Sequence, residues 1–332
     1  MTRSSVVIVS PAMAAANNGN WRTAQRWRDF IALRRPVRIA EHWPDGEAGG
    51  DGLMLALHAR RSSASAAAWA QAHGTRGLAV VLTGTDLYAD GGDPLVRRSL
   101  ELAQRVVVLQ SCALDELEPA WAAKARTIYQ SCEAHLPVPR PDGTLRVVMV
   151  GHLRDVKSPG TLMEAARRLR GREDILIDHI GAADEGHWER QARETDAECP
   201  AYRWLGPLAY PQARAAIAAA HVLVHTSAME GGAHVILEAV RSGTPVLASA
   251  VPGNIGMLGA DYEGYFPHGD ASALARQLER LRAAQLQGAQ SPAGQWLERL
   301  RAQCALREPL FQPEAERAAL LALLDDLQDP RP

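Results

Sequence analysis

Residues 230–243, EGGAHVILEAVRSG, constrain the fold of this chain more than any other stretch. The apolar run 221–225 precedes them and a second run, 245–248, follows. This pattern predicts a strand, a glycine turn, a helix that ends at a glycine, and a second strand, in that order. The same alternation recurs along the chain, and the run 145–150 is almost continuously apolar, which is typical of a parallel strand covered on both faces. The sequence therefore predicts an α/β protein.

Two carboxylates lie on either side of the predicted helix start. Glu230 precedes the glycines, and Glu238 lies roughly 8 Å beyond Ala233 at about 1.5 Å per residue. A helix that begins behind Gly231 and Gly232 offers backbone N–H groups and a positive dipole end, which suit a phosphate. A diphosphate there would place a sugar toward Glu230 and a ribose toward Glu238. Plain turn chemistry and solvated carboxylates give the same pattern, so the residues alone leave both interpretations open.

Composition excludes several classes of function. A chain of 332 residues is long enough for two domains, and a net charge of −2 gives no reason to expect nucleic acid or an anionic membrane as partner. No run approaches the roughly 20 apolar residues of a membrane span, and the apolar run 6–9 is too short for a secretory signal, so we expect a cytoplasmic protein. The four cysteines are scattered, which argues against a zinc site or disulfides.

The proline-rich stretch 137–143 separates two strand–helix series. We therefore expect a Rossmann-like domain over 1–140, a second over 141–312, and an amphipathic terminal helix over 313–332. Apolar runs predict strands at 6–10, 53–58, 78–82, 106–109, 127–129, 145–150, 175–181, 202–206, 222–225 and 245–248.

Polar residues follow several of these strands, at the edge where open α/β sheets bind ligands. His58, Arg60 and Arg61 follow the strand 53–58, and arginines there would suit a phosphate-like anion. Thr85 and Asp86 follow the strand 78–82 and are good hydrogen-bonding groups, although the same residues are ordinary helix-cap material.

The first strand leads through a glycine-containing loop into a helix that begins near Asn20. This is the usual geometry for approaching a phosphate, but a full G-x-G-x-x-G is missing, so Gly19 can equally be a turn residue.

Glu230, Glu238, Ala239, Gly243 and Pro245-Val resemble the signature of retaining family 4 glycosyltransferases. The resemblance implies the GT-B fold: two facing Rossmann-like domains, parallel sheets with helices on both faces, and a C-terminal helix crossing back to the first domain. It also implies that Glu230 lies by the donor sugar and that Glu238 binds the ribose. Gly231, Gly232 and Ala233, at the predicted helix start, are the further donor-binding residues that we expect.

The segment 151–157 is similar to the family's Gly-Arg-Leu-x-x-x-Lys, which implies that Lys157 contacts the diphosphate. His152 occupies the family's arginine position, so Arg154 becomes the expected substitute. The family also closes its first loop over the donor, which implicates Gly19 and Asn20. The sequence 265–270, YFPHGD, resembles a further family segment.

This chain departs from the family in two places. Gly232-Ala233 stands where Phe-Gly is common, and Gly84 or Thr85 stands where a histidine faces the reaction centre. The donor-sugar pocket and the acceptor side are therefore expected to differ from the family's. His234, just inside the predicted helix, is a further candidate for the donor site and can equally be a structural residue.

Residues 82–88, 151–154 and 229–235 look like those of selenosugar synthases of selenoneine biosynthesis. That resemblance implies transfer from a UDP-sugar such as UDP-N-acetylglucosamine to selenophosphate, with a carbon–selenium bond formed and with neither cofactor nor metal required. The expected acceptor-binding residues are Arg22, His58, Arg60, Arg61, Thr85 and Asp86.

Three alternatives stay open from the sequence. They are an ordinary glycosyltransferase acting on a sugar, lipid or thiol, a UDP-sugar epimerase, and a non-catalytic sugar-nucleotide-binding protein. The donor sugar, the anomeric outcome and the oligomeric state are not determined by these residues.

Overall fold

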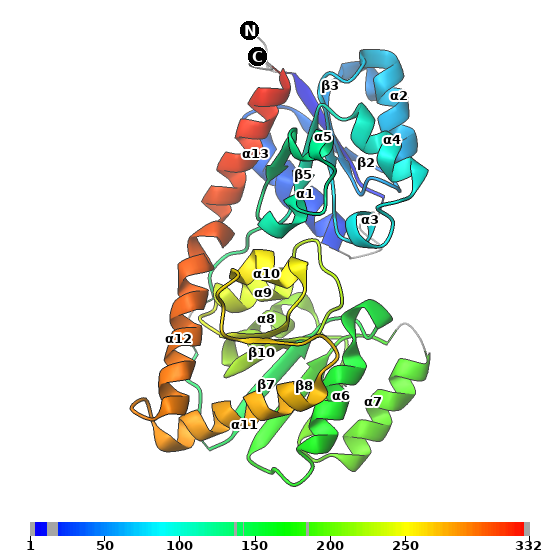
Figure 1. The fold of residues 1–332 in the computed structure, drawn as a ribbon. Helices are drawn as coiled ribbons and strands as arrows, with labels where there is room; N and C mark the ends of the chain where they lie inside the picture. The colour runs from blue at the N-terminus through cyan, green and yellow to red at the C-terminus, as the bar shows by residue number, and fades with distance from the viewer. Residues whose placement is uncertain (1–3, 12–18, 136–137, 142, 184–185, 329–332) are drawn as a thin grey trace. The chain divides into compact units, whose positions relative to one another are not determined.

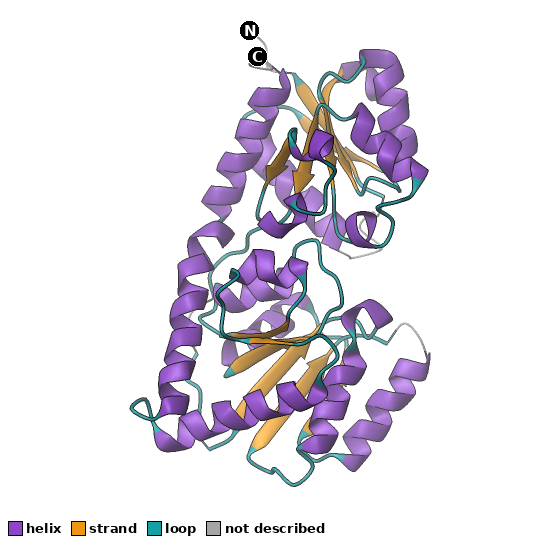
Figure 2. Cartoon of the chain, in the orientation of Figure 1, coloured by secondary structure: helices purple, strands orange, loops and turns teal. Residues whose placement is uncertain are grey.

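The computed structural model describes residues 4–11, 19–135, 138–141, 143–183 and 186–328, and it contains two compact α/β units (Figure 1). The first unit comprises the described residues up to Ser131, together with Glu230–Gly232 and residues 313–328. The second comprises the described parts of Cys132–Met229 and Ala233–Gln312. Each unit has a parallel sheet between helices (Figure 2). The α/β fold expected from the sequence is confirmed.

The first sheet has the strand order β2-β1-β3-β4-β5-β6, with all neighbours parallel. Its strands are β1 (Ser5–Val9), β2 (Val37–Ala40), β3 (Asp51–Leu57), β4 (Leu78–Val81), β5 (Arg105–Val108) and β6 (Ala125–Thr127). Its helices are α1 (Gly19–Ala32), α2 (Ser63–His73), α3 (Thr85–Tyr88), α4 (Pro94–Leu102), α5 (Pro119–Ala122) and α13 (Pro313–Gln328).

Alternate residues of the strands in the first unit face two separate cores, because successive side chains point to opposite faces of a sheet. Val6 and Ile8 of β1 lie in one core with Trp27 of α1 and the leucines of α13. Val7 and Val9 lie in the other core, which includes residues of α2 and α4. Both faces are therefore covered, which explains why these strands are apolar throughout.

The second sheet has the order β12-β11-β10-β7-β8-β9 and is also parallel. Its strands are β7 (Leu145–Val150), β8 (Ile175–Ile180), β9 (Tyr202–Gly206), β10 (Val222–His225), β11 (Val246–Ser249) and β12 (Tyr265–Phe266). Its helices are α6 (Pro159–Arg168), α7 (Gly186–Glu198), α8 (Tyr210–Ala219), α9 (His234–Val240), α10 (Pro252–Leu258), α11 (Ala271–Gln287) and α12 (Pro292–Arg307).

The terminal helix α13 belongs to the first unit and is fixed there by a buried carboxylate. Glu316 accepts hydrogen bonds from Arg26 Nε and Trp27 Nε1, both at 2.7 Å, and from Ser131 N at 2.8 Å. Leu320, Leu323, Leu324 and Leu327 are its buried leucines. Leu321 is partly buried and packs against the same core.

Several other expectations needed correction at element ends. The strand expected at 127–129 is β6, two residues earlier, and Ile128 follows it with its N–H still bonded to Val108 O. The edge strand β2 was not predicted, because Arg38 interrupts its apolar pattern. Pro137 and Asp142 of the predicted connection lie outside the described residues. Among those that are described, no helix is long and apolar enough to cross a membrane.

Candidate active site

The strand order of the second sheet reverses between β7 and β10. The strands β8 and β9 lie on one side of β7, and β10, β11 and β12 lie on the other side. The loops after β7 and β10 consequently diverge to opposite faces, and in open α/β sheets this switch point at the carboxyl edge is where ligands bind. Lys157 follows β7, and the Glu230–Glu238 stretch follows β10.

Hydrogen bonds join the loops after β7 and β10. The hydroxyl of Thr226, directly after β10, donates to the carbonyl oxygen of Lys157 at 2.7 Å. Ala228 N donates to Val156 O at 2.9 Å. These bonds fix the short 3₁₀ turn Asp155–Lys157, at whose end the half-buried Lys157 lies, whereas Arg154 just before the turn is exposed. Thr226 was not singled out from the sequence, although a hydroxyl directly after a buried strand was the available signal.

Two glycines let the loops after β7 and β8 approach each other. A Cβ atom on Gly181 would lie 1.9 Å from the carbonyl oxygen of Gly151, so only glycine fits at 181. Beyond this contact, Leu153 N donates to Ala182 O at 2.8 Å. The loop that carries Arg154 and Lys157 is thereby supported on both sides, from β8 and from β10.

The predicted helix after the glycines is α9, and it begins at His234. Its N-cap is Ala233, whose side chain cannot accept a hydrogen bond from the first N–H groups as Ser or Asp would. Glu238 is 4% exposed, and its Oε1 lies 3.6 Å from Nδ1 of His234, one turn earlier. Ser242 closes the helix by donating to the carbonyl oxygen of Glu238 at 2.7 Å.

Helix α8 supplies two residues near Glu238 that the sequence did not reveal. Arg214 Nη1 donates to Tyr210 OH at 3.4 Å, and its Nη2 donates to Glu133 O at 2.8 Å. Burial raises the pKa of Tyr210, and the negative charge of Glu238 raises this pKa further. A tyrosine and an arginine four residues apart share one helix face, which was the only sequence signal. The buried carboxylate therefore has an imidazole, a phenol and a guanidinium around it.

In the first unit the switch point lies between β1 and β3, and His58 follows β3 directly. His58 is 4% exposed with a left-handed backbone (φ 67°). Its Nε2 lies 3.2 Å from Thr85 Oγ1, and its Nδ1 lies 3.6 Å from Asp86 Oδ2. Burial lowers the pKa of His58, and the charge of Asp86 opposes this shift. The structure thus brings together three residues that the sequence placed after two neighbouring strands.

Asp86 is completely buried. Its carboxylate accepts backbone N–H groups from Ala59 at 2.8 Å, Thr83 at 2.8 Å and Gly84 at 2.9 Å. Asp86 therefore shapes the two loops after β3 and β4, and whether it also contacts an acceptor stays a prediction.

The remaining candidates of the first unit lie on other elements. Arg60 pairs with Asp93, with Nε 2.6 Å from Oδ2, and Arg22 is half-buried on α1. Gly19 and Asn20 begin α1, and the carbonyl oxygen of Gly19 accepts from Thr23 Oγ1 at 2.9 Å. Most of the loop before them, 12–18, lies outside the described residues.

Contacts group Glu230, Gly231 and Gly232 with the first unit. Glu230 is 8% exposed. A Cβ atom on Gly231 would lie 2.4 Å from Thr83 O, and one on Gly232 would lie 2.8 Å from Leu109 Cβ. The glycine at 232, where the family commonly has phenylalanine, therefore occupies a place with no room for a side chain.

Comparisons with known proteins agree with this fold. Residues 133–290 match the model of the family "Glycosyl transferases group 1". No protein with curated annotation matches the sequence. The solved structure of HepE from Anabaena, in complex with UDP and glucose, is 16% identical, with 98% of this chain and 100% of that chain covered and a TM-score of 0.69.

Two further solved structures cover almost the whole chain. Sucrose-phosphate synthase from Thermosynechococcus elongatus is 18% identical, with 98% of this chain and 99% of that chain covered and a TM-score of 0.76. A glycosyltransferase from Rickettsia africae is 12% identical, with all of both chains covered and a TM-score of 0.73. The chain therefore has the GT-B fold, and its residues 133–290 match the family model of the glycosyl transferases group 1.

Proposed function

We propose that this chain is a glycosyltransferase that moves a sugar from a UDP-sugar to selenophosphate and forms a carbon–selenium bond. UDP-N-acetylglucosamine is the donor we favour. The observation that carries the donor half of the proposal is the arrangement at the switch point of the second sheet. There the Lys157 loop is bonded to the loop after β10, and α9 holds the buried Glu238.

The second unit supplies the donor groups. Lys157, with Arg154 beside it, neutralises the diphosphate, and the first turn of α9 at Ala233 and His234 adds backbone N–H groups. Glu238 accepts hydrogen bonds from the ribose hydroxyls. In support, the similar HepE structure holds UDP and glucose. The donor contacts need no cofactor, and we propose that the reaction requires no metal.

The first unit supplies the acceptor groups. Its His58 places an imidazole beside Thr85, the region in which the sequence lacks the family's histidine. Burial lowers the pKa of His58, so the ring is neutral at pH 7 and orients the Thr85 hydroxyl without acting as a cation. Glu230 belongs to the same unit and is proposed to contact the donor sugar.

The reaction needs no general base, because selenophosphate is already an anion. Its selenium attacks the anomeric carbon while the bond from that carbon to the diphosphate oxygen breaks, and UDP leaves with the electron pair. The charge that develops on UDP is stabilised by Lys157. Hydrolysis of the phosphorus–selenium bond then releases phosphate and the selenosugar. We place this reaction in the cytoplasm.

UDP release from UDP-N-acetylglucosamine, measured with and without selenophosphate and followed by mass spectrometry, tests this proposal. Release that depends on selenophosphate, with a selenium isotope pattern on the sugar product, is the expected result. Release only with a sugar, lipid or thiol acceptor would reject selenophosphate and leave an ordinary glycosyltransferase. Donor interconversion without net UDP release would indicate an epimerase, and donor binding without any turnover would indicate a binding protein.

A further inference from the structure

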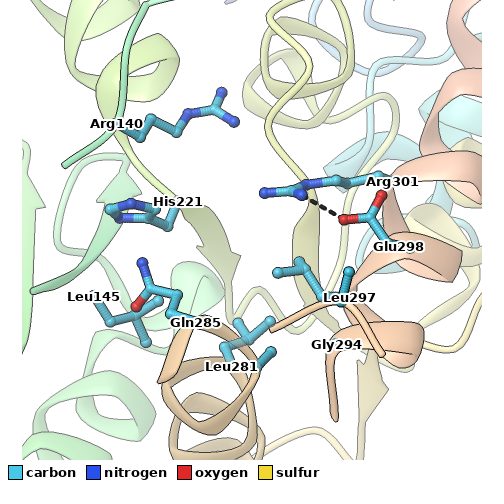
Figure 3. A pocket seen from close by; sticks show the side chains of 11 residues that line it. Arg140, Leu145, His221, Leu281, Gln285, Gly294, Leu297, Glu298 and Arg301 are labelled. Atoms are coloured by element: carbon cyan, nitrogen blue, oxygen red, sulfur yellow. Dashed lines mark hydrogen bonds and ion pairs between the residues drawn. The ribbon is translucent and has the colours of Figure 1, made fainter. Parts of the chain in front are cut away.

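A cavity of about 280 Å³ lies in the second unit, at the opposite edge of the sheet from the donor loops (Figure 3). Leu145, which begins β7, and His221, which precedes β10, form one wall. Helices α11 and α12 form the other walls. Because β7 has six residues at about 3.3 Å each, this edge lies roughly 20 Å from the loop after β7. The cavity is thus separate from the site described above.

Two arginines face the cavity from different walls. Figure 3 shows Arg140 on one side and Arg301, paired with Glu298, on the other. Burial lowers the pKa of Arg140, and the positive charge of Arg301 lowers it further, so the two cations repel each other across the space. Glu298 Oε1 lies 2.7 Å from Arg301 Nη1, so this carboxylate offsets one of the two positive charges. A net positive charge remains, which an anion would neutralise.

Arg140 is held in place independently of any ligand. Its guanidinium donates to the carbonyl oxygens of Ala218, Ser242 and Gly243 and to the hydroxyl of Thr244. These groups lie at the ends of α8 and α9, where helix carbonyls lack partners within the helix. The cation is therefore fixed beside the cavity.

Two neutral donors complete the lining. Gln285 Oε1 accepts from Arg282 Nη1 at 3.1 Å, which assigns Nε2 as the amide nitrogen turned toward His221 in Figure 3. Among the described residues, nothing accepts a hydrogen bond from this buried Nε2. His221 Nδ1 accepts from Arg146 N at 2.9 Å, so the neutral ring carries its proton on Nε2.

We propose that this cavity binds a small phosphate monoester. Donors on different walls suit the tetrahedral oxygens of a phosphate better than a planar carboxylate, and guanidinium groups bind phosphate with charge-assisted hydrogen bonds. Leu281 and Leu297 offer apolar surface to the carbon part of the ligand. The cavity volume is near the lower end of the usual range for small-molecule sites, which fits a ligand of a few carbon atoms.

Titration calorimetry with glycerol 3-phosphate, at constant ionic strength and with glycerol as the uncharged control, tests this site. Arg301→Gln keeps the backbone contacts made by Arg140 and should weaken binding about tenfold or more through loss of one charged donor. Gln285→Leu should also weaken it. Arg276→Gln removes an exposed arginine of the same helix α11, away from the cavity lining, and should change nothing.

Lys157→Ala separates this site from the donor site. We expect it to leave glycerol 3-phosphate binding unchanged. Binding that Lys157→Ala abolishes and Arg301→Gln preserves would place the phosphate elsewhere and overturn the proposal, as would the absence of binding to the wild-type protein at millimolar concentration.

Discussion

A carboxylate that is 4% exposed, as Glu238 is, is retained in a fold only where neighbouring groups stabilise it. His234 and the pair Tyr210–Arg214 surround it, and they come from two different helices. Such clusters of buried titratable groups at the carboxyl edge of a parallel sheet are typical of binding sites. Glu238 is therefore the residue on which the nucleotide assignment depends most.

Lys157 is one of two lysines in a chain with 36 lysines and arginines in total. Lys157→Ala should lower turnover by roughly 10²–10³-fold, because it removes a preorganised positive charge that stabilises the departing UDP. Arg154→Ala should cost less, since Arg154 is exposed. The turnover of both purified variants is measured as the rate of UDP release, and their melting temperatures are the control for folding. Near-normal turnover in Lys157→Ala would remove this residue from the site.

His179 gives stability a defined pH dependence. It is completely buried, with Nδ1 2.8 Å from Tyr202 OH, and burial lowers its pKa to about 3. The unfolded chain, with a histidine pKa near 6.5, binds the proton first as pH falls, so the folded state loses about 2 kcal/mol between pH 7 and pH 5. Denaturant unfolding of His179→Gln should show a flatter pH dependence than wild type. The exposed His42→Gln is the matched control, and equal slopes in all three proteins would contradict this account.

At the scale of elements, two loops depend on a glycine contact that no side chain can replace. Gly181→Ala should destabilise the protein by about 3 kcal/mol, because its Cβ meets the backbone oxygen of Gly151, which cannot move aside as a side chain can. Gly171→Ala has no atom within 4 Å of its Cβ and is the control. The denaturant midpoints of unfolding of the two variants test this prediction. Similar midpoints for Gly181→Ala and Gly171→Ala would mean that the loops rearrange to accommodate the added Cβ atom.

Helix α13 depends on one carboxylate. Glu316→Gln should destabilise the first unit by roughly 3 kcal/mol, because it leaves the charge of Arg26 without its partner and weakens the bonds to Trp27 and Ser131. Glu314→Gln on the exposed side of the same helix should have little effect. Thermal unfolding compares them, and an unchanged melting temperature in Glu316→Gln would show that α13 is held by its leucines alone.

Elements with an unbroken apolar pattern could be predicted from the sequence, and those stabilised by distant partners could not. The bounds of β7 and β10 match the expected runs because burial on both faces demands apolar residues throughout. β2 was missed because Arg38 is neutralised by Asp45 and Asp51, which lie 7 and 13 residues away. Tyr210 and Arg214 were missed for the same reason, because their position near Glu238 depends on how α8 packs against α9.

At the scale of the whole molecule, each unit carries its own part of the proposed chemistry. The motif residues divide between them, since Lys157 and Glu238 belong to the second unit while Glu230 groups with the first. A linear sequence gives no sign of this division, because Glu230 is only eight residues from Glu238. The resemblance pointed to both carboxylates in the sequence, whereas the contacts that join His58 to Thr85 and Asp86 are visible only in the folded chain.

Titration of UDP into the purified protein shows whether the second unit binds a uridine diphosphate, as the proposed donor site requires. We predict saturable binding of one UDP per chain, weakened about tenfold or more by Glu238→Ala and by Lys157→Ala because each removes a charged hydrogen-bonding group. Arg276→Gln should bind as wild type does. Absence of UDP binding at millimolar concentration, or binding that neither substitution changes, would show that Lys157 and Glu238 do not form a UDP site.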